Sequence, residues 1–301
     1  MSVQATQRLP FRTSTSLTSI DKRSKISRRE LIAEYLEPGI PVVLTDAAQE
    51  WGAMGKITPA FFKKKYGHFT KEIKGKSYTV AEVIDLIESS TPEKPAPYPC
   101  NLNIEKLFPE LMKDLKPEIV CGKSDRVKHP LLPKLMLRGT EVYELFLGGR
   151  GASFPYLHVD ALFLHTQITQ LYGSKDFILY APDQAAYMYP KDENKKVSQV
   201  DIFNPDYEKY PLFRKAKAVK VTVEEGETIL FPTKWWHTTQ IHEPSISVGR
   251  VHLNAWNWDD FTRDNYELRK KNHPAVALAT LAYGKVLGRL MDIQEKLNAP
   301  A

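Results

Sequence analysis

The chain has little cysteine and no long apolar run. Two cysteines, Cys100 and Cys121, occur among 301 residues, which argues against a disulfide framework and favours reduced thiols. No stretch approaches the roughly 18 to 20 consecutive apolar residues that a membrane-spanning helix needs. The N-terminal segment, Met1 to Lys25, lacks the apolar core of a signal peptide. We therefore expect a cytoplasmic protein, or a nuclear one in a eukaryote, without membrane association.

The composition is that of a folded protein with a basic surface. Hydrophobic residues make up 42% of the chain, enough to bury a sizeable core, and charged residues make up 26%. The formal net charge is +6, but the lysines are dispersed, with short clusters at 63–65 and 269–271. No cluster is interleaved with aromatic residues, as a nucleic-acid platform would be. We expect a solvated basic surface and no nucleic-acid partner.

The sequence divides into three parts. Residues 1–24 are rich in polar residues without an apolar period and predict a flexible arm. Residues 25–262 predict the main domain, and residues 263–301 predict C-terminal helices. Early in the domain, Ser27 to Glu30 fits a capping box that opens a short helix. Thr79 to Glu88 carries apolar residues at helical spacing behind a threonine cap.

The second half of the domain has the pattern of strands. Short apolar runs are separated by Gly, Pro and Asp turn signals, as in a β-sandwich or barrel. These runs cover residues 143–147, 177–180, 218–223, 228–231 and 246–256. Helical spacing returns at 265–271 and 275–297. The predicted fold class is therefore mainly β with flanking helices, an α+β architecture.

The sharpest chemical feature is the run His158-Val159-Asp160. In a strand, residues two apart point to the same face, so this imidazole and this carboxylate could bind one metal ion. His237, at the exit of the predicted strand 228–231, is the candidate third ligand. Two imidazoles and one carboxylate leave three adjacent positions open on an octahedral ion, the facial triad of iron(II) oxygenases.

Each of these signals is weak alone, because a histidine and an aspartate two residues apart occur by chance in many proteins. Lys175 adds a second kind of signal. It stands near the start of the apolar run 177–180, so its ammonium must either reach solvent or meet a buried anion. The distal carboxylate of 2-oxoglutarate would be such an anion, and an exposed surface lysine is the alternative.

Together these motifs resemble a known family. His158-Val159-Asp160, then Gly173-Ser174-Lys175 with a strand and Pro182, then Pro232-x-x-Trp235-Trp236-His237 are similar to the cupin-like JmjC hydroxylases. Within that family the resemblance is to the asparaginyl hydroxylase type that inhibits hypoxia-inducible factor, and it spans roughly residues 25–260. It implies a double-stranded β-helix (jelly-roll or cupin) core, with Fe(II) as cofactor and 2-oxoglutarate as co-substrate.

The resemblance also implies roles for individual residues. His158, Asp160 and His237 match the iron ligands, and Lys175 matches the lysine that pairs with the C5 carboxylate of 2-oxoglutarate. Asn254 matches an asparagine near the co-substrate. Thr166 falls where the family often has asparagine near the co-substrate, if the register is fixed backwards from Gly173. The sequence departs from the family in two places. The segment from Asp160 to Gly173 is about two residues longer than usual, and the family's threonine before the first ligand is missing, so that Tyr143 or Tyr156 would supply its hydroxyl.

The function that this implies is an oxygenase that uses O₂ and 2-oxoglutarate to hydroxylate an unactivated C–H bond. The substrate class expected from the resemblance is a protein or peptide side chain, or an amino-acid-like small molecule. Two alternatives stay open within the same fold: a tRNA-modifying hydroxylase and a non-oxygenase metal-binding cupin, such as an isomerase or hydrolase. A catalytically silent scaffold is a third alternative, against which the intact ligand positions argue.

The remaining signals predict structure. His165 is expected in the core or beside the ligands, and His242 and His252 are expected to be structural or exposed. The helical run at 275–282 is apolar around most of its circumference, more than a surface stripe requires. Two explanations stay open for it: a homodimer interface through the C-terminal helices, or packing against the chain's own jelly roll.

Overall fold

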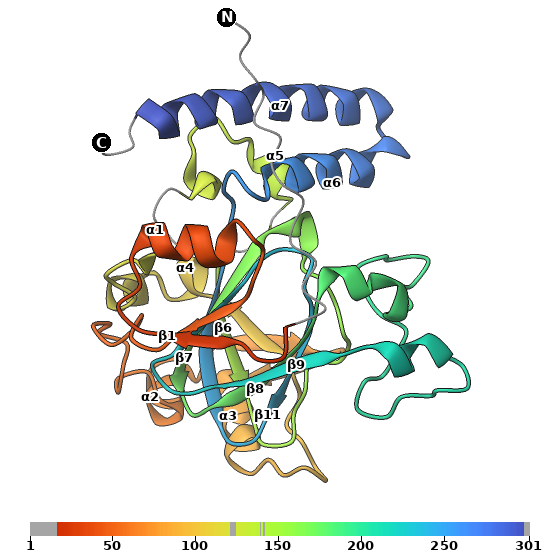
Figure 1. Cartoon of the computed structure of the whole chain (residues 1–301). Coiled ribbons are helices and arrows are strands. Elements are labelled where there is room, and N and C mark those ends of the chain that lie inside the picture. The colour runs from red at the N-terminus through yellow and green to blue at the C-terminus, as the bar shows by residue number, and fades with distance from the viewer. Residues whose placement is uncertain (1–16, 121–124, 139, 141, 298–301) are drawn as a thin grey trace, which may run out of the picture.

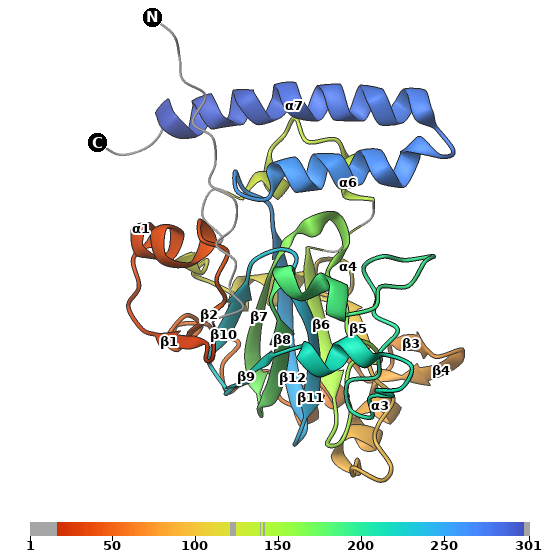
Figure 2. The same cartoon turned by 45° about the vertical axis from the view of Figure 1, so that its right-hand side comes forward.

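Two facing β-sheets form the body of the protein (Figures 1 and 2). The computed structural model describes residues 17–120, 125–138, 140 and 142–297. The larger sheet has seven strands in the order β1-β2-β10-β7-β12-β6-β5, and the smaller has three in the order β11-β8-β9. A separate hairpin pairs β3 with β4. The predicted jelly-roll architecture with flanking helices is confirmed.

The strands are short, and β6, β8, β9, β10 and β12 follow the five predicted apolar runs, whereas β7 and β11, which are rich in polar residues, have no predicted run. Their bounds are β1 Asp21–Arg23, β2 Val42–Leu44, β3 Thr70–Ile73, β4 Lys76–Thr79, β5 Cys100–Asn103, β6 Tyr143–Gly148, β7 His165–Tyr172, β8 Lys175–Tyr180, β9 Ala218–Val223, β10 Thr228–Phe231, β11 Trp236–Ile241 and β12 Ser245–His252. The last strand is shorter than the predicted run 246–256. It ends at His252 because Leu253 and the residues after it turn toward the next helix, where Asn257 donates a side-chain hydrogen bond to the His252 carbonyl.

The helices lie around the sheets. Their bounds are α1 Arg28–Leu31, α2 Pro59–Tyr66, α3 Val80–Glu88, α4 Ile104–Leu107, α5 Lys134–Leu137, α6 Trp258–Lys270 and α7 Pro274–Leu297, with shorter turns η1 Ile32–Leu36, η2 Pro109–Asp114, η4 Arg126–Lys128, η5 Ala161–Phe163, η6 Pro182–Tyr187 and η7 Pro211–Lys215. The predicted capping box at Ser27 is present, and the predicted cap at Thr79 is also a capping box, completed by Glu82. In the described part of the chain, no helix combines the length and the apolarity needed to cross a membrane.

Apolar side chains fill the space between the two sheets at one end. Ile168 and Ile229 of the larger sheet pack in one cluster with Phe177, Leu179 and Val221 of the smaller sheet. A second cluster joins the outer face of the larger sheet to the N-terminal helices. Polar side chains, among them Thr166, Lys175 and His237, also project between the sheets among apolar ones, and they line a cavity.

The two C-terminal helices lie side by side across one end of the β-structure (Figures 1 and 2). Two glycines of α7 allow their close approach. A β-carbon on Gly284 would lie 2.6 Å from Thr262 Cγ2, and one on Gly288 would lie 2.2 Å from Trp258 Nε1. Helix α6 begins at Trp258, seven residues before the predicted start at 265, because its first turns are anchored by buried Trp258 and Phe261 despite their polar neighbours.

Candidate metal centre and co-substrate cavity

Two backbone segments hold the predicted histidines beside each other. His158 and His237 form an antiparallel bridge, in which each backbone N–H donates to the carbonyl of the other, at 3.1 and 2.8 Å. Val159 N–H donates to the Lys196 carbonyl on the other side, at 2.8 Å. The His158 segment is therefore extended backbone held by bridges and not the regular strand that the sequence suggested.

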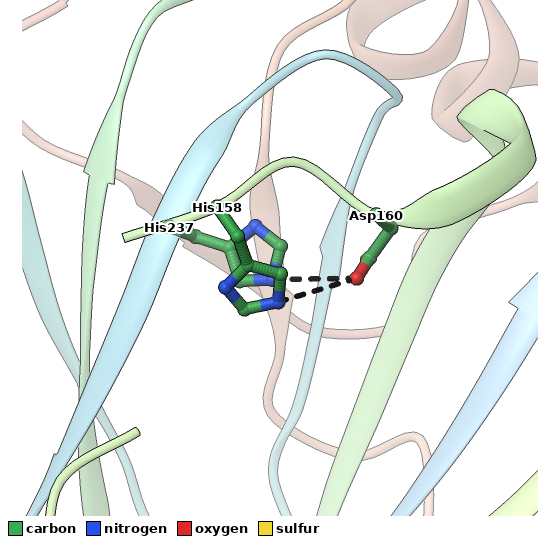
Figure 3. A group of neighbouring side chains, drawn as sticks. All are labelled: His158, Asp160 and His237. Atoms are coloured by element: carbon green, nitrogen blue, oxygen red, sulfur yellow. Dashed lines mark ion pairs between the residues drawn. The ribbon is translucent and has the colours of Figure 1, made fainter. Parts of the chain in front are cut away.

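Both imidazoles face the carboxylate of Asp160 (Figure 3). Nε2 of His158 lies 3.5 Å and Nε2 of His237 lies 3.7 Å from the same oxygen, Asp160 Oδ1. One ligand atom from each residue lies within 4.8 Å of the other two. Ligand atoms at about 2.1 Å from one octahedral ion, in neighbouring positions, lie roughly 3 Å apart. A small closure around an ion would therefore bring the three atoms to bonding distance.

Hydrogen bonds to the other ring nitrogens fix which atoms face the centre. His237 Nδ1 lies 3.0 Å from the Trp235 carbonyl, and His158 Nδ1 lies 3.4 Å from the Tyr156 carbonyl. A carbonyl only accepts, so in each ring Nδ1 donates and Nε2 of the neutral ring carries a lone pair. Burial, reinforced by the neighbouring His158, lowers the pKa of His237 to about 4. Two nitrogen lone pairs thus face one carboxylate oxygen, an arrangement that a cation between them would stabilise.

Thr166 of β7 orients the carboxylate. Its hydroxyl donates to Asp160 Oδ2, which leaves Oδ1 toward the imidazoles. Burial alone would raise the pKa of Asp160, but the imidazoles of His237 and His158 and the Thr166 hydroxyl hold it well below its usual range. The carboxylate is therefore ionised at neutral pH, as metal binding requires.

Lys175 is buried at the far end of the same cavity. Its side chain is 2% exposed, and Nζ donates to Ser247 Oγ at 2.6 Å between the rings of Phe146 and Phe177. No carboxylate of the described residues pairs with it, and burial lowers its pKa to about 7. A buried ammonium without an anion is costly, so the site fits an anionic group of a small molecule.

The cavity connects these two ends. It has a volume of about 310 Å³, and its lining includes all three candidate ligands, Thr166 and Lys175. Lys175 pairs with Ile241, four residues along β11 from His237, which is about 13 Å of strand. Between them lies Thr239, whose buried Oγ1 has no hydrogen-bond partner among the described residues. A dicarboxylate that bound a metal at one end would supply that partner and reach the extended lysine side chain at the other.

Two predicted co-substrate contacts lie elsewhere. Tyr143 packs in the outer core, because its neighbour Glu144 takes the cavity face of β6 and alternation turns Tyr143 away. Asn254 lies beyond the end of β12, where its Oδ1 contacts His165 Nε2 at 3.2 Å. Neither residue lines the cavity among the described residues, so the expectation that they contact 2-oxoglutarate is not supported by their placement.

The other histidines serve the fold. His165 is fully buried, accepts a hydrogen bond from Thr233 N–H at Nδ1, and has its pKa lowered to about 4 by burial. His252 is buried and lies between Asp125 Oδ2 at 3.0 Å and Gln167 Oε1 at 2.8 Å. Cys100 is a buried free thiol, and Cys121 lies outside the described residues.

Some cavity residues could not be identified from the sequence. Tyr98 stands in a proline-rich connection, but its ring is buried and lines the cavity, and burial raises its pKa to about 12, so its hydroxyl keeps its proton. Gly249 of β12 lies on the cavity floor, where a β-carbon would lie 2.8 Å from the Phe146 ring. The one sequence signal for this position is strand alternation, because Ser247 and Gly249 are two residues apart in β12 and therefore share a face.

Comparison with known proteins agrees with this geometry. A family model described as "Cupin-like domain" matches residues 62–263. The chain is 26% identical over 259 residues to "Jumonji C domain-containing protein 5" of Drosophila melanogaster. The aligned segment covers 80% of this chain and 61% of that protein. It is 27% identical over 255 residues to "Lysine-specific demethylase JMJ30" of Arabidopsis thaliana, covering 80% and 56%.

A third relative matches a shorter segment. "tRNA wybutosine-synthesizing protein 5" of Gallus gallus is 32% identical over 131 residues, covering 43% of this chain and 39% of that protein. The chain thus spans less than two thirds of the length of each of these relatives. With the family model covering most of the chain, and with the triad and the jelly roll in place, the protein belongs to the cupin-like JmjC family, whose members use Fe(II) and 2-oxoglutarate.

Proposed function

We propose that the protein is an Fe(II)- and 2-oxoglutarate-dependent hydroxylase. The observation that carries the proposal is one cavity with three convergent ligand atoms at one end and a buried, anion-free ammonium at the other. An oxygenase-type enzyme is what the family indicates, and the choice of hydroxylation over demethylation is ours.

Each residue has a defined task in this proposal. His158, Asp160 and His237 hold the ion, and Thr166 keeps one carboxylate oxygen turned toward it. Lys175 binds the distal carboxylate of 2-oxoglutarate. Bound together, Fe(II) and 2-oxoglutarate supply the oxidising chemistry that consumes O₂, releases succinate and CO₂ and places one oxygen atom in a C–H bond. Apolar walls, including Phe146 and Phe177, exclude water from the co-substrate end.

The surroundings of the cavity support a polypeptide substrate. A second hollow of about 510 Å³ lies beside the metal end, and Phe154, Tyr156 and Thr238 line both spaces. This hollow has room for residues that flank a hydroxylated side chain, whereas a free amino acid would leave it unused. An amino-acid-like small molecule is therefore the second choice.

Two other functions remain as alternatives. The tRNA-related relative and the basic net charge of +6 favour a tRNA-modifying hydroxylase. A non-oxygenase cupin would keep the triad but would have no need for buried Lys175. Succinate formation from 2-oxoglutarate with Fe(II) and ascorbate separates the oxygenases from the latter: we expect turnover, and its complete absence would favour the non-oxygenase.

The substrate test is a mass-spectrometric search of cell extract incubated with enzyme, Fe(II) and 2-oxoglutarate. We expect peptides that gain the mass of one oxygen atom. Release of formaldehyde without that gain would mean demethylation, and modified tRNA with unmodified protein would mean the tRNA alternative.

We also propose that the enzyme is a homodimer through α7. Its exposed side carries residues separated alternately by three and four positions, the heptad pattern of a coiled-coil seam. The six large members are 39% to 79% exposed, whereas the opposite side of the helix packs on α6. We call these residues the α7 seam: Val276, Ala279, Tyr283, Val286, Leu290, Ile293 and Leu297. A seam that is apolar along the whole helix matches a second copy of itself.

Sedimentation of a charged seam variant tests the dimer. The double substitution Val286→Glu and Ile293→Glu should give a monomer at micromolar concentration, because four carboxylates would meet in an apolar contact. Leu278→Glu is the matched control, since Leu278 is 59% exposed on the same helix but lies off the seam. A monomeric parent protein, or a double variant that stays dimeric, would contradict the proposal.

A further inference from the structure

The turn that follows Asp160 has a strained backbone. In η5, Leu162 has φ 58° and Phe163 has φ 50°. Left-handed conformations cost roughly 1–2 kcal/mol for a residue with a side chain, and strain of this kind persists only where the surroundings enforce it. Because the turn begins one residue after a candidate metal ligand, whatever holds it also holds that ligand.

Phe163 is held by groups from three other segments. Two ammonium groups lie over its ring, with Lys196 Nζ 4.7 Å and Lys234 Nζ 5.7 Å from the centroid. Its carbonyl accepts a hydrogen bond from Nδ2 of buried Asn257 at 3.0 Å, at the start of α6. The ring is thus held by two cation–π contacts and the backbone by one hydrogen bond.

Each of the two lysines belongs to a segment that delivers a candidate ligand. The Lys196 carbonyl accepts from Val159 N–H, the residue between His158 and Asp160. Lys234 stands three residues before His237 and is itself left-handed, with φ 71°. The position of these two lysines therefore affects both sides of the triad.

Two carboxylates of α6 pair with these lysines. Asp264 Oδ1 lies 2.6 Å from Lys196 Nζ, and Asp260 Oδ2 lies 2.8 Å from Lys234 Nζ. Residues four apart share one face of a helix, so α6 presents both carboxylates to the ligand segments. Asp264 is 7% exposed, and its Oδ2 has no hydrogen-bond partner among the described residues. A buried carboxylate oxygen without a partner costs stability, which favours a role in the site over a role in folding.

We infer that Asp260 and Asp264 are positioning residues, which set the geometry of the triad through Lys234, Lys196 and the η5 turn. The inference rests on the proposed metal role of the triad. Groups that hydrogen-bond directly to metal ligands typically change metal affinity roughly 10- to 100-fold when they are removed. Asp260 and Asp264 act from further out, through the two lysines, so their effect should be smaller. Loss of Asp264 frees Lys196, releases Phe163 and lets the Asp160 turn relax toward ordinary backbone angles.

The test is the Mn(II) affinity of substituted, metal-free protein. Asp264→Asn, Asp260→Asn and their combination are titrated with Mn(II) by electron paramagnetic resonance, and thermal unfolding is followed in parallel. We expect Asp264→Asn to raise the dissociation constant by up to about tenfold, the lower end of the range for groups bonded directly to a ligand, with a smaller rise for the more exposed Asp260. The matched control is Glu267→Gln, which removes an exposed ion pair with Lys270 on the same helix and should leave the affinity unchanged.

A rescue experiment separates positioning from general stability. The charge exchange Lys196→Asp with Asp264→Lys keeps the pair and should restore part of the lost affinity. If Asp264→Asn does not fold, Asp260→Asn carries the test through the second arm. Parent protein that binds Mn(II) with the same affinity as the folded variants overturns this inference alone. Parent protein that binds no Mn(II) overturns the proposed function and this inference with it.

Discussion

Two clusters of histidine and aspartate lie on opposite faces of the large sheet, and they differ in how their polar atoms are used. On the outer face, His252 bonds to Asp125 and Gln167, and Asp125 also accepts from two backbone N–H groups. In the cavity, two imidazole nitrogens face one oxygen of Asp160 beyond hydrogen-bond distance. The hydrogen bonds of the outer cluster are satisfied within the protein, whereas the imidazole nitrogens and the Asp160 oxygen in the cavity have no donor between them.

The comparison shows what distinguishes a structural cluster from a metal centre. Both contain buried histidine and an ionised carboxylate whose pKa is held low. They differ in the direction of the lone pairs, since in the outer cluster donors meet acceptors and in the cavity acceptors meet acceptors. Residue type and burial alone would not separate them.

Asp160→Asn should give the largest effect, because it removes the only anionic ligand of the triad. We expect no measurable Mn(II) or Fe(II) binding and no succinate formation, with little change in the thermal stability of metal-free protein. Calorimetric titration measures the metal binding, and thermal unfolding measures the stability of the metal-free protein. Metal binding by this variant at the parent affinity would mean that Asp160 is not a ligand, and a parent protein that binds no metal would mean that the cavity cluster is structural.

Asp125→Ala should give the opposite result. Its carboxylate is buried and pairs with His252 and Arg250. Its removal leaves buried Arg250 with Glu118 at 3.5 Å as its remaining carboxylate and should cost about 3 kcal/mol of unfolding free energy, the lower end of the range for breaking a buried ion pair. Metal affinity of the folded fraction should stay at the parent value. Chemical denaturation measures the loss, and an unchanged midpoint would contradict the structural role of the outer cluster.

Lys175→Met tests the far end of the cavity. It removes the ammonium but keeps the apolar stem, so 2-oxoglutarate should bind about 10- to 150-fold more weakly, corresponding to a charged hydrogen bond of about 1.5–3 kcal/mol. Metal affinity without 2-oxoglutarate should not change. If the co-substrate binds equally well to both proteins, Lys175 is not its partner.

The pH dependence of 2-oxoglutarate binding follows from the same residue. Burial lowers the pKa of Lys175 to about 7 in the free protein, and an anion stabilises the charged form. Affinity should therefore be full below pH 7 and fall by up to about tenfold per pH unit as the pH rises through 7, until the pKa of the complex is reached. The unfolding free energy of the free protein should instead increase as the pH rises from about 7 to about 10.5. In this window the unfolded chain still binds the proton that the folded protein has lost. Calorimetry in buffers of different ionisation enthalpy should detect proton uptake on binding above pH 7, and its absence in Lys175→Met is the control.

Gly249→Ala should have the smallest effect. The added methyl group would press on Phe146 and Ile168 at the cavity floor, 2.8 and 3.1 Å away. We expect the KM for 2-oxoglutarate to rise roughly five- to tenfold, about 1 kcal/mol, with kcat nearly unchanged. An unchanged KM would mean that the co-substrate does not reach this part of the cavity.

Much of the site could be predicted from the sequence because its signals are local. The two-residue spacing of His158 and Asp160 and the strand exit before His237 are visible in the chain, and the resemblance joined them. Lys175 was identified from the conflict between its charge and an apolar strand. The short apolar runs and turn residues predicted a β-sandwich or barrel, and the family resemblance identified it as a jelly roll.

The rest depends on contacts between distant segments. Tyr98 reaches the cavity only because β5 pairs with β6, more than forty residues along the chain. The sequence does not determine which face of β6 Tyr143 occupies. Successive side chains of a strand point to opposite faces, and both faces of this strand are covered, one by the outer core and one by the cavity. The ion pairs of α6 join residues 68 and 26 positions apart, and no spacing rule predicts them.

The two glycines of α7 make the C-terminal pair of helices sensitive to single substitutions. A methyl group at Gly284 or Gly288 would collide with Thr262 or Trp258 and increase the distance between the helix axes. Such a change would tilt the outward face of α7 and shift the inward carboxylates of α6 together. Variants at these two positions would therefore affect both the proposed dimer surface and the proposed positioning carboxylates, although neither glycine lines the cavity among the described residues.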